Sequence, residues 1–143
     1  MAGPDTRSSF ARRAHVLLTL LLAGVMIAAG VAHFVTPEPF VGIVPNVLPA
    51  PRTLVLVSGV FEILGGAGLL IPRTRRAAAW GLIALYVAVF PANINMAVNG
   101  LPFGDHPPDP VLAWLRLPFQ AVFIAWAWYV GRLSREPASA ASA

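Results

Sequence analysis

The chain has 143 residues, of which 57% are hydrophobic and 11% are charged, and its mean hydropathy is +0.72. A soluble domain usually carries about a quarter charged residues, so this chain lacks the polar groups needed to cover a globular surface. It contains no cysteine, which excludes a disulfide scaffold, a zinc-thiolate site and dithiol redox chemistry. All ten basic residues are arginines, and eight of them lie in short clusters, a pattern typical of membrane-flanking charge and not of a nucleic-acid surface. The sequence therefore predicts a small integral membrane protein.

Hydropathy predicts four membrane-spanning helices, at residues 15–34, 54–71, 78–97 and 111–130. Each span holds 18 to 20 residues, so as a helix it is about 27–30 Å long and matches the hydrocarbon thickness of a bilayer. We therefore expect an all-α fold, in which residues 15–132 form a four-helix transmembrane bundle. Residues 1–14 are expected to be a cytoplasmic tail, and residues 133–143, rich in alanine and serine, a disordered one.

Arginine clusters orient the predicted bundle. They lie before the first span, between the second and third, and after the fourth. Their members are Arg7, Arg12, Arg13, Arg73, Arg75, Arg76, Arg132 and Arg135. The two other connections carry only Arg52 as a basic residue. The positive-inside rule then places both termini in the cytoplasm and the two proline-rich loops outside, in a multi-pass protein of the inner membrane. Cleavage of the first span as a signal peptide is disfavoured, because no small-residue cleavage site is evident.

The first outer loop, residues 36–52, has the pattern of a short helix. Thr36 can cap a helical turn that begins with Pro37. Apolar residues then follow on one face: Phe40, Ile43, Val44, Val47 and Leu48. We expect one or two interfacial helical turns on the outer side, which either cover the bundle as a lid or anchor it to the bilayer surface.

Small residues predict how the spans pack. Ser58, Gly59, Glu62, Gly65 and Gly66 share one face of the second span. The third span carries a similar stripe, formed by Ala77, Gly81, Ala84, Ala88 and Ala92. Because small residues allow close approach of helices in lipid, we expect these two stripes to meet inside the bundle, or alternatively to form a homodimer face. Pro91 and Pro118 lie inside the third and fourth spans and are expected to kink them.

Seven polar residues are predicted to gather in the outer half of the membrane: His33, Ser58, Glu62, Asn93, Asn95, Arg116 and Gln120. With a rise of 1.5 Å per residue, Glu62 and Arg116 fall at compatible depths, about 12 Å and 7–8 Å from the outer ends of their helices. A buried charge in lipid needs a partner, so we expect an ion pair between Glu62 and Arg116, flanked by the other five residues.

This polar cluster has three interpretations. It could bind a lipophilic molecule with a polar head, because intramembrane ionisable groups usually have a function. It could instead be a network that only fixes helix register. A proton or ion path is the weakest interpretation, since the inner half of the spans is almost free of polar residues. No catalytic or metal-binding residues are predicted, because His15, His33 and His106 are far apart and lack a carboxylate at ligand spacing.

Four sequence strings resemble the DoxX-like family of small bacterial four-helix membrane proteins. They are AHFVTPEPFVGIVPNVLPAPR, SGVFEILGGAGLLIPRTRRAAAWG, FPANINMA and LRLPFQ, and the resemblance covers about residues 15–132. It implies that nine residues occupy motif positions of the family: His33, Pro37, Phe40, Pro45, Glu62, Asn93, Asn95, Arg116 and Gln120. It also implies a non-catalytic accessory subunit that holds a quinone or a lipid headgroup for a membrane or periplasmic oxidoreductase. A scaffolding protein is the alternative, and a small transporter or membrane enzyme is a third.

Overall fold

The computed structural model describes residues 5–132, which form five helices. These are α1 (Asp5–Val35), α2 (Glu38–Val41), α3 (Pro51–Leu70), α4 (Arg75–Asn99) and α5 (Pro110–Arg132). All but α2 are long and apolar enough to cross a membrane, as in a multi-pass membrane protein. The all-α fold class is confirmed for this part of the chain. The disorder predicted for residues 133–143 concerns positions outside the described residues.

Helix ends differ from the predicted spans mainly at the arginine clusters. α1 begins at Asp5, so much of the predicted N-terminal tail is helical, and α4 begins at Arg75. Hydropathy detects the apolar stretch that fits a bilayer core, whereas a helix can continue into charged residues that lie beyond it. Arginine also has a high helix propensity, which favours this extension.

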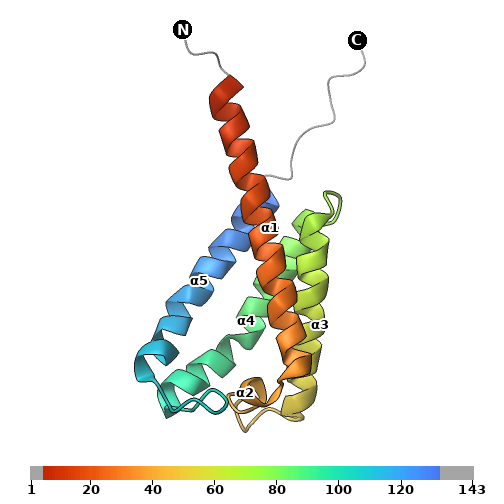
Figure 1. Cartoon of the computed structure of the whole chain (residues 1–143). Helices are drawn as coiled ribbons and strands as arrows, with labels where there is room; N and C mark the ends of the chain where they lie inside the picture. The colour runs from red at the N-terminus through yellow and green to blue at the C-terminus, as the bar shows by residue number, and fades with distance from the viewer. Residues whose placement is uncertain (1–4, 133–143) are drawn as a thin grey trace.

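The four long helices run up and down, so that chemically different segments gather at opposite ends (Figure 1). One end, which we call the arginine end, holds the start of α1, the turn between α3 and α4, and the close of α5. The other, which we call the loop end, holds α2 and the connection between α4 and α5. α3 packs mainly against α1 and α4, and α5 packs mainly against α4. The loop end corresponds to the outer side predicted from the arginines.

Glycines bring α1 and α3 close together. A Cβ on Gly59 would lie 2.7 Å from the Cβ of His33, and one on Gly66 would lie 2.8 Å from the carbonyl oxygen of Ala23. In contrast, Gly65 faces Leu82 of α4. The small residues of α3 therefore pack against two helices, α1 and α4, and the backbone of α1 is the closer of the two.

The predicted meeting of the two small-residue stripes is therefore wrong. On α4, the side of the helix that carries Ala77, Gly81, Ala84 and Ala88 is exposed, and Leu82 and Tyr86 are buried instead. A spacing of three or four residues identifies a face that permits close approach, but it does not say which helix approaches. The alternative that this α4 face contacts a second copy stays a prediction.

The connection between α1 and α3 contains the predicted short helix, although its details differ. Pro37, not Thr36, is the N-cap of α2, and the Thr36 hydroxyl donates back to the carbonyl oxygen of Ala32 at 3.3 Å. Ile43 is buried, whereas Val47 is 89% exposed, so the expected continuous apolar face ends before Val47. Helices α4 and α5 continue through Pro91 and Pro118.

Candidate functional site

A pocket of about 450 Å³ lies at the loop end, next to α2 and lined by residues of α1, α3, α4 and α5. Most of its wall is apolar. The apolar lining consists of Phe40, Ile43, Val44, Pro45, Leu48, Leu54, Val55, Val57, Phe61, Leu85, Ala88, Val89 and Ala92. The polar lining consists of His33, Ser58, Glu62, Asn93 and Arg116. Five of the seven predicted site residues thus share this pocket, and Asn95 and Gln120 do not line it.

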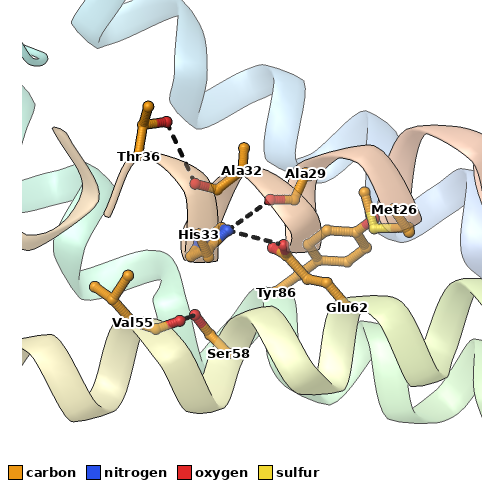
Figure 2. Close-up of polar contacts among 9 residues, drawn as sticks. All are labelled: Met26, Ala29, Ala32, His33, Thr36, Val55, Ser58, Glu62 and Tyr86. Atoms are coloured by element: carbon orange, nitrogen blue, oxygen red, sulfur yellow. Dashed lines mark hydrogen bonds and ion pairs between the residues drawn. The ribbon is translucent and has the colours of Figure 1, made fainter. Parts of the chain in front are cut away.

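Glu62 pairs with His33 across the contact between α3 and α1 (Figure 2). Nδ1 of His33 lies 3.2 Å from Oε2 of Glu62 and 2.7 Å from the carbonyl oxygen of Ala29. Both neighbours are acceptors, so Nδ1 carries a proton. The shorter contact directs the hydrogen toward Ala29, and Oε2 of Glu62 accepts no hydrogen bond from the described residues. Both side chains are largely buried.

The predicted ion pair between Glu62 and Arg116 is wrong. Within residues 5–132, Glu62 lies beside His33, and the arginine that forms an ion pair with a carboxylate is the exposed Arg52, with Glu38. Depth along a helix sets how far a side chain lies from the membrane surface, but not the direction in which it points around the helix axis. Gly59 brings α3 against α1 one turn before Glu62, which places the carboxylate beside His33 instead.

Arg116 contacts an aromatic ring in place of a carboxylate. Its guanidinium lies 4.1 Å from the ring centroid of Phe103, a residue of the loop between α4 and α5. Phe103 packs edge-on against Phe40 at 5.3 Å, and Phe40 stacks on His33 at 3.9 Å. A row of contacting aromatic and guanidinium groups from α1, α2, the loop between α4 and α5, and α5 therefore joins the two sides of the pocket. No described carboxylate pairs with Arg116, whose cation–π contact leaves its N–H donors for other partners.

The remaining predicted residues form structural hydrogen bonds. Nδ2 of Asn93 donates to Oε1 of Gln120 at 2.9 Å, and Nε2 of Gln120 donates to the carbonyl oxygen of Tyr86. Tyr86 lies next to Val87, whose carbonyl oxygen loses its helical hydrogen bond because Pro91 has no N–H. This network therefore ties α5 to the weak point of α4.

Two further bonds are local to the loop end. Nδ2 of Asn95 donates to the carbonyl oxygen of Ile43 at 2.9 Å and holds the segment after α2 against α4. The Ser58 hydroxyl donates to the carbonyl oxygen of Val55 at 2.8 Å, within its own helix (Figure 2).

Sequence reasoning missed Phe103, which supports Arg116. The residue lies in a loop rich in proline and glycine, where neither hydropathy nor helical periodicity assigns it a neighbour. The sequence did offer one signal for this contact, which is an aromatic residue next to a glycine in the connection that leads to α5, the helix of Arg116. Gly104 has a left-handed φ of 64° and lies against Pro39, which brings this loop to α2.

A family model for a domain of unknown function, DUF8561, matches residues 22–131. The chain belongs to the DUF8561 family. This match replaces the DoxX-like assignment that the sequence strings suggested, so the redox partner implied by that resemblance loses its basis. No curated protein and no solved structure matches the chain. Every residue that lines the pocket lies within the DUF8561 domain.

Proposed function

We propose that the DUF8561 domain spans the inner membrane with four helices and its arginine end in the cytoplasm. Supporting this orientation, every arginine cluster lies at one end, while the loop end carries Glu38, Asp105 and Asp109. The loop end, and with it the pocket, then lies in the outer leaflet. Both termini lie on the cytoplasmic side.

We further propose that the pocket binds a lipophilic molecule with a polar head, of a quinone-like or lipid-like kind. The observation that carries this proposal is Arg116, a cation without a carboxylate partner in the described residues, at the edge of a largely apolar pocket. A register-fixing network would satisfy Glu62 and Arg116 by direct contact and would enclose no volume. Apolar walls with a few converging polar groups are what small-molecule pockets have in common.

The pocket residues divide naturally between the two parts of such a ligand. Arg116 can donate hydrogen bonds to carbonyl or phosphate oxygens, and such charge-assisted bonds are stronger than neutral ones. Glu62 also lines the pocket, but its Oε2 is buried beside Nδ1 of His33, so Arg116 is the main donor to the ligand head. The apolar chain would contact the aliphatic residues of α3 and α4. The role that we propose is binding of this ligand, with no catalytic step.

The pocket also reaches the lipid-facing surface. Leu54, Val57 and Phe61 of α3 line it, and their residues are 41%, 46% and 56% exposed. In a membrane these residues would face acyl chains. A ligand dissolved in the bilayer could therefore enter sideways between α3 and α4 without passing through water.

A purely structural role is the second candidate, and the bonds of Gln120 and Asn95 favour it for those two residues. They join α4 to α5 and to the segment after α2, and neither side chain reaches the pocket. We therefore remove Gln120 and Asn95 from the proposed binding residues. His33, Ser58, Glu62, Asn93 and Arg116 remain.

The test is native mass spectrometry of the full chain released from lipid nanodiscs, with identification of the small molecules that it retains. Ala92→Leu fills the pocket, and Ala84→Leu adds the same volume to an exposed position of α4 outside it. We expect the wild type and Ala84→Leu to retain one compound above the bulk lipids, and Ala92→Leu and Arg116→Gln to lose it. Equal retention by all four proteins, or no enriched compound in the wild type, would overturn the proposal.

A further inference from the structure

A second cavity lies at the opposite end of the molecule from the pocket. This groove, of about 260 Å³, runs between the start of α4 and the close of α5. Arg76, Ala79, Trp80 and Ile83 line it from α4, and Trp128, Gly131 and Arg132 line it from α5. A Cβ on Gly131 would lie 2.7 Å from the Cβ of Ala79, so the two helices approach closely there.

The groove collects positive charge that no carboxylate of residues 5–132 pairs with. The neighbouring Arg75 is already engaged, because its Nε donates to the carbonyl oxygen of Leu69 at the end of α3. The Arg132 guanidinium lies over the Trp128 ring at 4.7 Å. Neither Arg76 nor Arg132 forms an ion pair with a described carboxylate. Two guanidinium groups therefore line one small groove without a described counter-charge.

The aromatic residues of the groove indicate its level in the bilayer. Trp80 and Trp128 are 56% and 46% exposed and lie within one helical turn of Arg76 and Arg132. Tryptophan side chains in membrane proteins concentrate at the height of the lipid headgroups. Apolar contact is available next to the charge, from Ala79 and Ile83. An occupant that carries a negative charge beside apolar chains at this height matches the lining.

We propose that this groove binds the headgroup of an anionic phospholipid. Arg76 and Arg132 bind the phosphate oxygens, and Trp80 and Trp128 flank the glycerol region. Basic pockets between membrane helices on the cytoplasmic side are known to hold anionic headgroups, and guanidinium groups suit phosphate geometry. The site needs membrane insertion but is independent of the pocket at the loop end. It would fix the relative position of α4 and α5 in the inner leaflet.

The experiment measures lipid binding to the full chain in detergent by native mass spectrometry. Dioleoyl phosphatidylglycerol is compared with dioleoyl phosphatidylcholine, which has the same chains and no net charge. The groove variant is Arg76→Gln with Arg132→Gln. The matched control is Arg12→Gln with Arg13→Gln, which removes the same charge from exposed positions of α1. We expect the groove variant to bind the first phosphatidylglycerol molecule about thirtyfold more weakly than the wild type does. The control variant should bind it with an affinity within about twofold of the wild type.

Three results would overturn the proposal. The first is equal binding of the two lipids, and the second is an equal loss of phosphatidylglycerol affinity in the groove and control variants. The third is full displacement of the lipid by millimolar inorganic phosphate, which would make free phosphate the ligand. If the double variant does not purify folded, Arg132→Gln alone carries the test. Its expected loss is about fivefold, and wild-type affinity in that variant would overturn the proposal as well.

Discussion

Gly30 and Gly59 face each other where α1 meets α3, and this contact sets the position of His33. A Cβ on Gly30 would lie 2.6 Å from the carbonyl oxygen of Gly59 and 3.0 Å from the backbone nitrogen of Ile63. Backbone atoms cannot rotate away as a side chain can, so the helices themselves would have to separate. The pairing of His33 with Glu62 depends on this close approach.

Gly30→Ala is therefore expected to lower the free energy of unfolding by about 1–3 kcal/mol. The control is Gly24→Ala in the same helix, because nothing lies within 4 Å of a Cβ at that position. We expect Gly24→Ala to leave stability unchanged or slightly raised. Unfolding in mixed micelles, followed by circular dichroism, measures both variants. Equal effects of the two substitutions would contradict the close contact between α1 and α3.

The partner of Glu62 is testable by double-mutant cycles. We expect Glu62→Gln and His33→Gln to show a coupling energy of about 0.5–3 kcal/mol in the free energy of unfolding, because the two side chains touch. Glu62→Gln and Arg116→Gln should instead add to within about 0.5 kcal/mol. Coupling of Glu62 to Arg116 but not to His33 would contradict the geometry of the site.

At the scale of elements, α2 and the segment after it cover the pocket from the loop end. Ile43 and Val44 line the pocket, and the bond from Asn95 to the Ile43 carbonyl oxygen attaches this segment to α4. Phe40 adds a second attachment by stacking on His33. Phe103 packs edge-on against Phe40, and Gly104 lies against Pro39. The Asn95 bond is thus a hydrogen bond from α4 to the cover, and the aromatic and apolar contacts add to it.

Asn95→Ala should loosen this cover. Because the chain has no cysteine, Val44→Cys reports access to the pocket without background labelling. We expect maleimide to label Val44→Cys several-fold faster when Asn95→Ala is also present. Asn46→Cys, at an exposed position of the same segment, should react at the same rate with or without Asn95→Ala. An unchanged rate at Val44→Cys would show that the Asn95 bond does not hold the cover.

The helices were predictable from the sequence because a long apolar run, or a proline at the first position of a helical turn, is a local signal. The four long helices and the short α2 follow from those signals. The neighbours of each helix were not predictable in the same way. Both α3 and α4 carry small-residue stripes, but that of α3 meets mainly α1, and most of that of α4 is exposed. Periodicity defines a face, whereas pairing depends on how all the faces fit together.

The candidate site shows the same division at the scale of the whole molecule. The position of each residue along its span predicted that His33, Glu62 and Arg116 lie at similar depths in the membrane, and all three line the pocket. Depth alone could not distinguish the residues that line the pocket from Gln120, which lies at a similar depth but forms a hydrogen bond to α4. Nor could it find Phe103, since a loop residue has no helical register. The depth of a side chain along the helix axis was predictable from the sequence, whereas the direction in which that side chain points around the axis was not.

Orientation of the whole molecule is tested by reporter fusions. We expect a fusion after Arg76, in the arginine end, to be active in the cytoplasm, and a fusion after Asp105, in the loop end, to be active outside it. Alkaline phosphatase and green fluorescent protein report the two compartments. Activity of both fusions in the same compartment would contradict the four-span arrangement, because the described helices place these residues at opposite ends.

The most direct test of the binding proposal is electron cryomicroscopy of the chain in native-lipid nanodiscs, with a bound antibody fragment that adds mass for alignment. We expect non-protein density in the loop-end pocket, with the head of the ligand against Arg116 and its chain leaving between α3 and α4 past Phe61. The contradicting result is a pocket closed by side chains, with Arg116 in direct contact with Glu62 and no density beside them.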